Sequence, residues 1–238
     1  MNEDGFYISA YSREHEALYA IVADGMGGHQ AGEVASCMAI EQVSETVNQG
    51  FRGDMSLSEI KSLLVSALKR ANRSIYEKSQ SESSCGGMGT TLTLCLILAD
   101  QAVVAHVGDS RAYMFRKHKL HQITSDHSLV NELIKNGQIT ADEAANHPQK
   151  NVITRALGTD AGVEIDLYEF KLRPDDMLLL CSDGLSNMLS DSELSELLAV
   201  GQTQTPLELT EKLVANANKK GGLDNITAVL LTKESELC

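Results

Sequence analysis

The residues of this sequence that could carry out chemistry are aspartates at the ends of apolar runs. Four apolar runs each have an aspartate at one terminus, and a fifth aspartate precedes the first run; they are Asp24, Asp109, Asp183, Asp224 and Asp4. A single Asp-Gly or Asp-Ser pair after a strand usually marks a turn, so only the repetition is informative. Carboxylates that gather in one place raise one another's pKa values and need a compensating cation. Oxygen ligands favour Mg²⁺ or Mn²⁺, and a site for such an ion is expected.

The stretch that begins at Asp24 reads "DGMGGH" and has three glycines within four positions. Glycine lacks a Cβ atom and accepts positive φ, so it suits backbone that must approach another group closely. Two interpretations stay open at this point. The glycines either form a tight turn after a strand, or they let the backbone beside Asp24 touch a ligand.

The elements that must position these aspartates are mostly short strands. Two pairs of adjacent runs are separated by only three residues, which indicates antiparallel pairing. Hairpins are expected around Asp100-Gln101 and around Asp109-Ser110. The runs are 6–11, 17–23, 90–98, 102–107, 111–115, 163–170, 177–181 and 226–231.

Helices are expected between and after these strands. Apolar spacing predicts one helix over 34–47 that stops at Gly50, and a second that follows Ser58 as its N-cap. The polar segment 79–87 is expected to be a surface loop, and short helices are expected at 129–135 and after Thr140. Three of the expected helices begin with the capping-box pattern, a serine or threonine with a glutamate three positions later; the pairs are Thr140 with Glu143, Ser190 with Glu193, and Thr205 with Glu208. Helices grouped outside hairpin strands indicate a layered α/β sandwich.

The composition excludes some classes of protein. The formal net charge is −13 and the pI is about 4.9, so no basic footprint for nucleic acid is present and anionic lipid would repel the chain. Five cysteines form no CxxC pair, which favours a reducing compartment without a disulfide framework. The start "MNEDGFY" is not a signal peptide, and the longest apolar run, 94–99, is too short to span a bilayer. A soluble, cytoplasmic protein that binds neither nucleic acid nor membrane is expected.

Eight motifs in this sequence resemble, in order, those of the bacterial metal-dependent protein phosphatases of the 2C type (the PPM family). Each motif alone is weak, but eight in order over nearly the whole chain are specific. They are "NED" at 2–4, "DGMGGHQAGEVAS" at 24–36, "GMGTT" at 87–91, "HVGDSRAY" at 106–113, "LHQITSDHS" at 120–128, "NVITRALG" at 151–158, "LLLCSDGL" at 178–185 and "GGLDNIT" at 221–227.

The resemblance implies an α+β fold with four layers. Two antiparallel sheets would pack face to face, with a pair of helices on each outer side. Residues 1–238 would form one domain of the 2C type, and a flap subdomain at about 126–160 would lie beside the active site.

The resemblance also implies the roles of individual residues in a centre of two Mn²⁺ or Mg²⁺ ions. Asp24 would bridge both ions, Asp183 and Asp224 would complete one of them, and the carbonyl of Gly25 would bind the other, which explains the glycines. Asp4 would reach the centre through water. Asp109 and Asp183 would hold a third, weaker ion, and Asn225 would support the ligands. The residues implied to be catalytic are Asp24, Asp183 and Asp224.

The activity implied by the resemblance is hydrolysis of phosphoserine and phosphothreonine on proteins. A hydroxide bridging the two ions would attack phosphorus directly, without a phosphoenzyme, and the partners would be a bacterial serine/threonine kinase and its phosphorylated substrates. A monomer that acts in signalling is expected. Two alternatives stay open: a non-catalytic relative that only binds phosphoproteins, and a phosphohydrolase for a different phosphorylated substrate.

Two features of the motifs leave roles unassigned. His29 and His127 lie in family motifs, but a loop histidine is more often solvated or hydrogen-bonded than a general acid, and His106 is expected to be packed within a strand. Members of the family usually have a strand and a phosphate-binding arginine before "NED", whereas this sequence begins at Met1. The substrate-binding residue is therefore unknown and Arg13 is not taken as a substitute. A higher KM and lower stability are expected, without loss of metal.

Overall fold

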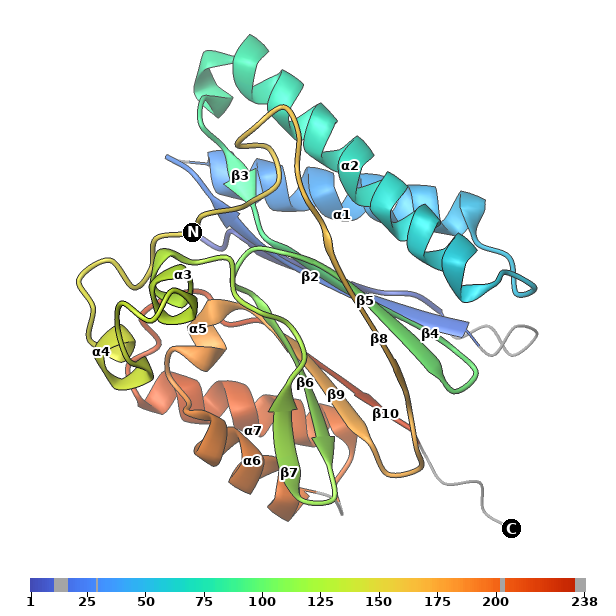
Figure 1. Ribbon diagram of the computed structural model, residues 1–238, viewed down its shortest axis with the longest axis vertical. Coiled ribbons are helices and arrows are strands. Elements are labelled where there is room, and N and C mark those ends of the chain that lie inside the picture. The colour runs from blue at the N-terminus through green and yellow to red at the C-terminus, as the bar shows by residue number, and fades with distance from the viewer. Residues whose placement is uncertain (11–16, 29, 202–203, 234–238) are drawn as a thin grey trace.

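The computed structural model describes residues 1–10, 17–28, 30–201 and 204–233, and its strands form two antiparallel sheets (Figure 1). One sheet has the order β1-β2-β4-β5-β8, with β3 paired to the end of β2. Its strands are β1 (Asp4–Ile8), β2 (Ala17–Met26), β3 (Gly89–Thr90), β4 (Leu92–Leu98), β5 (Gln101–Val107) and β8 (Asp166–Lys171). The other sheet has the order β10-β9-β6-β7. Its strands are β6 (Arg111–Arg116), β7 (Lys119–Gln122), β9 (Met177–Cys181) and β10 (Ala228–Thr232).

Helices cover the outer face of each sheet, so the molecule has the four layers that were expected (Figure 1). The long helices α1 (Ala31–Gly50) and α2 (Leu57–Ser81) pack on the larger sheet. On the smaller sheet lie α6 (Asp191–Val200) and α7 (Pro206–Lys219). The single-turn elements are η1 (Ser83–Cys85) after α2 and α5 (Asp183–Ser186) after β9.

Apolar side chains that alternate between the two faces of the central strands form three apolar layers. Side chains of a strand point to opposite faces in turn. On β9, Leu179 packs against the helices α6 and α7, whereas Leu178 and Leu180 pack between the sheets. On β2, Ile21 faces α1 and α2, and Val22 faces the other sheet. Because both faces of these strands are buried, their termini are held firmly at the end of the sandwich.

Helix starts agree with the capping boxes found in the sequence, with one correction. The boxes at Thr140, Ser190 and Thr205 are all formed. The N-cap of α2 is Ser56 and not Ser58, because Ser56 has Glu59 three residues later and the two exchange both capping hydrogen bonds. The expected loop 79–87 is also partly wrong, since α2 continues to Ser81 and η1 follows.

The expected hairpin at Asp109-Ser110 is wrong. The strands before and after it, β5 and β6, belong to different sheets. Both edges of β5 are already occupied, by β4 and β8, so β6 has no free edge in that sheet and pairs with β9 instead. The turn at 108–110 therefore carries the chain from one sheet to the other. The hairpin at Asp100-Gln101 is confirmed as the β4–β5 connection.

Boundaries of other predicted strands shift by a few residues. The structure begins β8 at Asp166 and β10 at Ala228, later than predicted, and it ends β1 at Ile8. Tyr11, the predicted end of the first strand, lies outside the described residues. None of the helices in the described ranges is long and apolar enough to cross a membrane.

The segment 126–160, here named the flap segment, leaves the sandwich between β7 and β8. It contains α3 (Leu129–Lys135), at the bounds expected from the sequence, and α4 (Ala141–Ala145). Backbone hydrogen bonds join its two arms, from Leu129 N–H to Val152 O at 2.9 Å and from Thr154 N–H to His127 O at 2.8 Å. Its role as a flap, and the single domain over 1–238, stay predictions.

The packing of α2 on the larger sheet predicts the effect of a core substitution. Leu64 is fully buried there, and Leu64→Ala should lower the free energy of unfolding by about 2–5 kcal/mol because a cavity adds to the lost apolar burial. Urea denaturation measures this change. The control Leu207→Ala removes a side chain that is 69% exposed and should change stability by less than about 0.5 kcal/mol. Equal losses in both variants would contradict this packing.

Candidate metal centre

The aspartates predicted from the sequence come together at one end of the two sheets. Asp4 and Asp24 are directly paired across β1 and β2. On the other sheet, β9 and β10 are paired at Cys181 and Ala228, so Asp183 lies two residues after one strand and Asp224 lies four residues before the other. Asp109 lies in the turn that crosses between the sheets.

Hydrogen bonds tie the two sheets together at this end. The Ser182 hydroxyl donates to Asp4 Oδ2 at 2.7 Å and accepts from the Thr227 N–H at 3.0 Å. The Glu3 N–H donates to Asn225 Oδ1 at 2.8 Å. The start of β1 is therefore fixed to the loop before β10. The implied role of Asn225 as a support of the metal ligands stays a prediction.

The backbone of Asp24 is held by the threonines of the "GMGTT" motif. Its N–H donates to Thr91 Oγ1 at 2.9 Å, and its carbonyl accepts from the Thr91 N–H at 2.8 Å and from the Thr90 hydroxyl at 3.0 Å. Thr91 also shares a hydrogen bond of 2.7 Å with the hydroxyl of Ser110, next to Asp109. One fully buried threonine thus positions two of the acidic sites.

The glycines after Asp24 are not equivalent. A Cβ atom at Gly25 would lie 2.1 Å from the carbonyl oxygen of Gly32 and 2.7 Å from that of Glu3, whereas one at Gly28 meets no described atom within 4 Å. Gly25 is therefore required by close backbone contacts between β1, β2 and the start of α1. His29, at the end of this stretch, lies outside the described residues.

Burial and mutual repulsion perturb the carboxyl groups. Burial first, and then the charges of four neighbouring aspartates, Asp4, Asp183, Asp109 and Asp224, together raise the pKa of Asp24 to about 9. Burial is also the main cause of the raised pKa values of Asp4 and Asp183, and it raises the pKa of Asp109 to about 7. Such repulsion between buried carboxylates is what a bound cation relieves.

The donor atoms fit a hard divalent ion. In the ranges that the structure describes, no three Asp, Glu, His or Cys side chains form a closed metal-binding group; the aspartates influence one another's pKa values without meeting at one point. Oδ1 of Asp109 and Oδ1 of Asp183 are buried and have no hydrogen-bond partner among the described residues. Buried oxygens without partners are costly, and ligation of Mg²⁺ or Mn²⁺ by oxygen would satisfy them.

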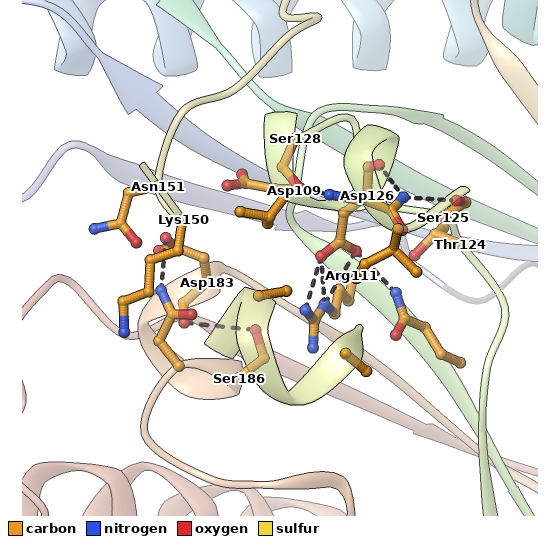
Figure 2. A pocket seen from close by; sticks show the side chains of 17 residues that line it. Asp109, Arg111, Thr124, Ser125, Asp126, Ser128, Lys150, Asn151, Asp183 and Ser186 are labelled. Carbon is orange, nitrogen blue, oxygen red and sulfur yellow. Dashed lines mark hydrogen bonds and ion pairs between the residues drawn. The ribbon is translucent and has the colours of Figure 1, made fainter. Parts of the chain in front are cut away.

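A cavity of about 540 Å³ lies between these aspartates and the flap segment. Figure 2 shows Asp109 and Asp183 in its wall, with Lys150 and Asn151 entering from the flap segment. Asn187 donates to Asp183 Oδ2 at 3.0 Å and orients that carboxylate. The cavity is thus open to a ligand that would touch both the acidic residues and the flap segment.

The histidines near the site are engaged in packing and hydrogen bonds. His106 is fully buried, as expected, and burial lowers its pKa to about 3. Nδ1 of His127 accepts from the Gly108 N–H at 3.0 Å, and Nε2 lies 3.3 Å from Asp166 Oδ2. Burial, and then the charge of Arg155, lower the pKa of His127. It is a neutral residue that supports the structure and is poorly placed to donate a proton to a substrate.

Comparison with known proteins identifies the family. The family model described as "Protein phosphatase 2C" matches residues 1–225. The chain belongs to the protein phosphatase 2C family. The serine/threonine phosphatase stp of Listeria monocytogenes is 42% identical over 214 residues, which are 90% of this chain and 84% of that relative.

Solved structures of 2C-type relatives have the same fold. The S. agalactiae serine/threonine phosphatase aligns with a TM-score of 0.88 and 41% identity over 98% of this chain and 94% of that chain. The catalytic domain of PstP, solved with two manganese ions, aligns with a TM-score of 0.80 and 35% identity over 97% of this chain and 90% of that one. The expected family, fold class and enzyme class, a metal-dependent protein-serine/threonine phosphatase, are thereby confirmed.

Sequence reasoning missed several residues of this 2C-type site. Ser182, Thr91 and Thr90 lie inside quoted motifs, yet no role was assigned to them. Their positions in the sequence could have identified them. Each of these residues lies within one or two residues of the end of a strand, and an aspartate lies beside that strand end or in a strand paired with it. Arg111 and Asp126, which form a bidentate ion pair in the cavity wall, were also overlooked because they lie 15 residues apart.

The close contacts of Gly25 predict that phosphatase activity is sensitive to a substitution at this position. Gly25→Ala should reduce Mn²⁺-dependent phosphatase activity by about tenfold or more, because a 1 Å displacement of a positioned group can cost about a hundredfold in rate. Phosphate release from a phosphothreonine peptide measures this effect. Gly28→Ala changes the same loop where there is space and should retain most of the activity. Similar losses in both variants would show that loop composition, and not the contact at Gly25, matters.

Proposed function

We propose that this chain hydrolyses phosphoserine and phosphothreonine on proteins, using two divalent cations held by the clustered aspartates. The observation that carries the proposal is the pair of buried, unpartnered oxygens of Asp109 and Asp183 beside Asp24, whose pKa is raised to about 9. Carboxylates in this state need cations, and the family to which the chain belongs supplies the reaction.

The proposed ligands come from both sheets. Asp24 would be the ligand shared by both ions, Asp183 and Asp224 would hold one of them, and the carbonyl of Gly25 would hold the other. Asp4 is held by the Ser182 hydroxyl and acts through water. The support for this assignment is the influence of the other four carboxyl groups on the pKa of Asp24 and the hydrogen bonds that orient Asp4 and Asp183.

The chemistry divides between the ions and the chain. Divalent ions at these ligands lower the pKa of water and neutralise charge that develops on the phosphoryl oxygens. The chain's own groups fix the ligands on rigid strand ends, so little reorganisation is needed during the reaction. The cavity beside Asp109 and Asp183 is large enough, at about 540 Å³, to admit the phosphorylated side chain.

A third ion is proposed at Asp109 and Asp183, and Mn²⁺ or Mg²⁺ is proposed for all sites. The unpartnered Oδ1 atoms of these two residues support the third position. The resemblance to the family implies that binding at this position is weaker than at the other two.

The proposed partners are a serine/threonine kinase and the proteins that it phosphorylates, in the cytoplasm. Cys85, Cys95 and Cys181 are free thiols in the structure, which suits a reducing compartment. The net charge of −13 disfavours binding to nucleic acid or to anionic lipid. A monomer remains the expectation.

The ligand assignment predicts the effect of removing one carboxylate. Asp183→Asn and Asp224→Asn should each lower phosphate release from a phosphothreonine peptide by about a hundredfold or more, since even indirect partners of metal ligands contribute 10–100-fold. The measurement is a Mn²⁺ titration of each purified variant, with an EDTA control. Asp54→Asn alters a carboxylate that is 85% exposed and should leave the titration unchanged.

The alternative functions give different outcomes in the same assay. A binding-only relative would release no phosphate in Mn²⁺ while still retaining a phosphothreonine peptide in calorimetry. A phosphohydrolase with another substrate would favour a nucleoside monophosphate over the peptides. Full activity in EDTA, or in the Asp183→Asn variant, would contradict the proposed metal centre.

A further inference from the structure

The turn that carries Asp109 is bound on both sides by the first two residues of the flap segment. Before Asp109, Gly108 and His127 exchange two hydrogen bonds, from His127 N–H to Gly108 O at 2.8 Å and from Gly108 N–H to His127 Nδ1 at 3.0 Å. After it, Arg111 donates from Nε and Nη2 to the Asp126 carboxylate at 3.0 and 2.7 Å. The dipeptide 126–127 therefore spans the turn 108–111.

The same dipeptide is joined to both arms of the flap segment. Asn131 of α3 donates from its amide to the Asp126 carbonyl at 2.5 Å and to the Ser125 hydroxyl at 3.0 Å. On the returning arm, the Thr154 N–H donates to the His127 carbonyl at 2.8 Å. A displacement of either arm must therefore be transmitted to residues that touch the turn of Asp109.

Arg111 is the residue with the geometry to enforce this connection. Its side chain is 25% exposed and that of Asp126 is 14% exposed, so the pair is shielded from water. Nη1 also donates to the fully buried Tyr113 hydroxyl at 2.9 Å, which in turn donates to Asp191 at the start of α6. The guanidinium is thus fixed from the core side and holds Asp126 in one orientation. Figure 2 shows the ion pair in the wall of the cavity that Asp109 also lines.

We propose that Arg111 is a positioning residue which, through Asp126, couples the location of the flap segment to cation binding at Asp109. When a rigid connection links a binding site to a segment that can change position, binding at the site and ordering of the segment favour each other to the same extent. A cation on Asp109 would order the flap segment, and an ordered flap segment would strengthen cation binding. The inference rests on the proposed function for the ion at Asp109, and it adds a connection to the segment that faces a protein substrate.

A matched variant is available on the same strand. Arg111 begins β6, and Arg116 ends it with an equivalent bidentate pair to Asp176, from Nε at 2.8 Å and Nη2 at 2.5 Å. The Arg116 side chain is 22% exposed, close to the value for Arg111. Lysine keeps the charge but loses the planar pair of donors. Arg111→Lys and Arg116→Lys are therefore alike in chemistry and differ in distance from Asp109.

Hydrogen exchange by mass spectrometry, with and without Mn²⁺, tests the coupling without relying on turnover. In the unsubstituted protein and in Arg116→Lys, saturating Mn²⁺ should slow exchange in residues 128–158. In Arg111→Lys this protection from exchange should be largely lost. The Mn²⁺ concentration that gives half of the remaining protection should rise about fivefold or more, which is the usual lower bound of coupling between sites. Calorimetric titration with Mn²⁺ should show weaker binding to the low-affinity site in Arg111→Lys alone.

The direction in which Mn²⁺ affinity changes distinguishes a positioning role of Arg111 from a purely electrostatic one. Arg111→Met removes a positive charge near Asp109. Electrostatics alone would then strengthen Mn²⁺ binding, because less positive charge repels the ion. The positioning role predicts weaker Mn²⁺ binding instead. Equal behaviour of Arg111→Lys and Arg116→Lys, or tighter Mn²⁺ binding in Arg111→Met, would overturn the inference. Hydrolysis of p-nitrophenyl phosphate by the unsubstituted protein is measured in parallel. If it is absent the proposed function fails, while exchange and calorimetry still report on the coupling.

Discussion

The main constraint on this structure is the repulsion among the carboxylates that the fold brings together at one end of the two sheets. Five aspartates approach one another there, and burial together with the charges of the other four raises the pKa of Asp24 to about 9. A cluster of this kind opposes folding unless neighbouring groups orient it and a cation compensates its charge. The Ser182 hydroxyl, the amide of Asn187 and the backbone contacts of Gly25 provide that orientation. Much of the surrounding sequence is explained by this requirement.

Neither sheet holds the acidic centre alone. Asp4 and Asp24 come from the larger sheet, whereas Asp183 follows a strand of the smaller sheet. The apolar layer between the sheets fixes their separation, and the two cross-sheet hydrogen bonds at Ser182 and Asn225 fix their register at the site. Formation of the centre is therefore coupled to complete packing of the sandwich. A 2C-type phosphatase needs this because its chemistry relies on positioned charges more than on a reactive side chain.

The flap segment supports the turn that carries Asp109. Rigid strand ends hold the other aspartates, but the turn of Asp109 is bound by Asp126 and His127. Strand ends give precision, and a segment outside the sandwich can adapt to different protein substrates. Joining the two at one turn places the flap segment next to Asp109, one of the proposed cation ligands. The partly buried ion pair of Arg111 is costly to desolvate, and its contribution lies in fixing the geometry of the turn.

The sequence by itself determined the features that depend on neighbours within one or two turns. The capping boxes, such as Thr140 with Glu143, need only a spacing of three residues, and the alternation on the strands needs a period of two. Ordered motifs also fixed the family and the set of aspartates. Only the tertiary structure decided which sheet β6 joins, because that depends on which strand edges are already occupied. It alone also distinguished Gly25 from Gly28 and paired Arg111 with Asp126, since contacts between segments far apart in the chain leave no local spacing to read.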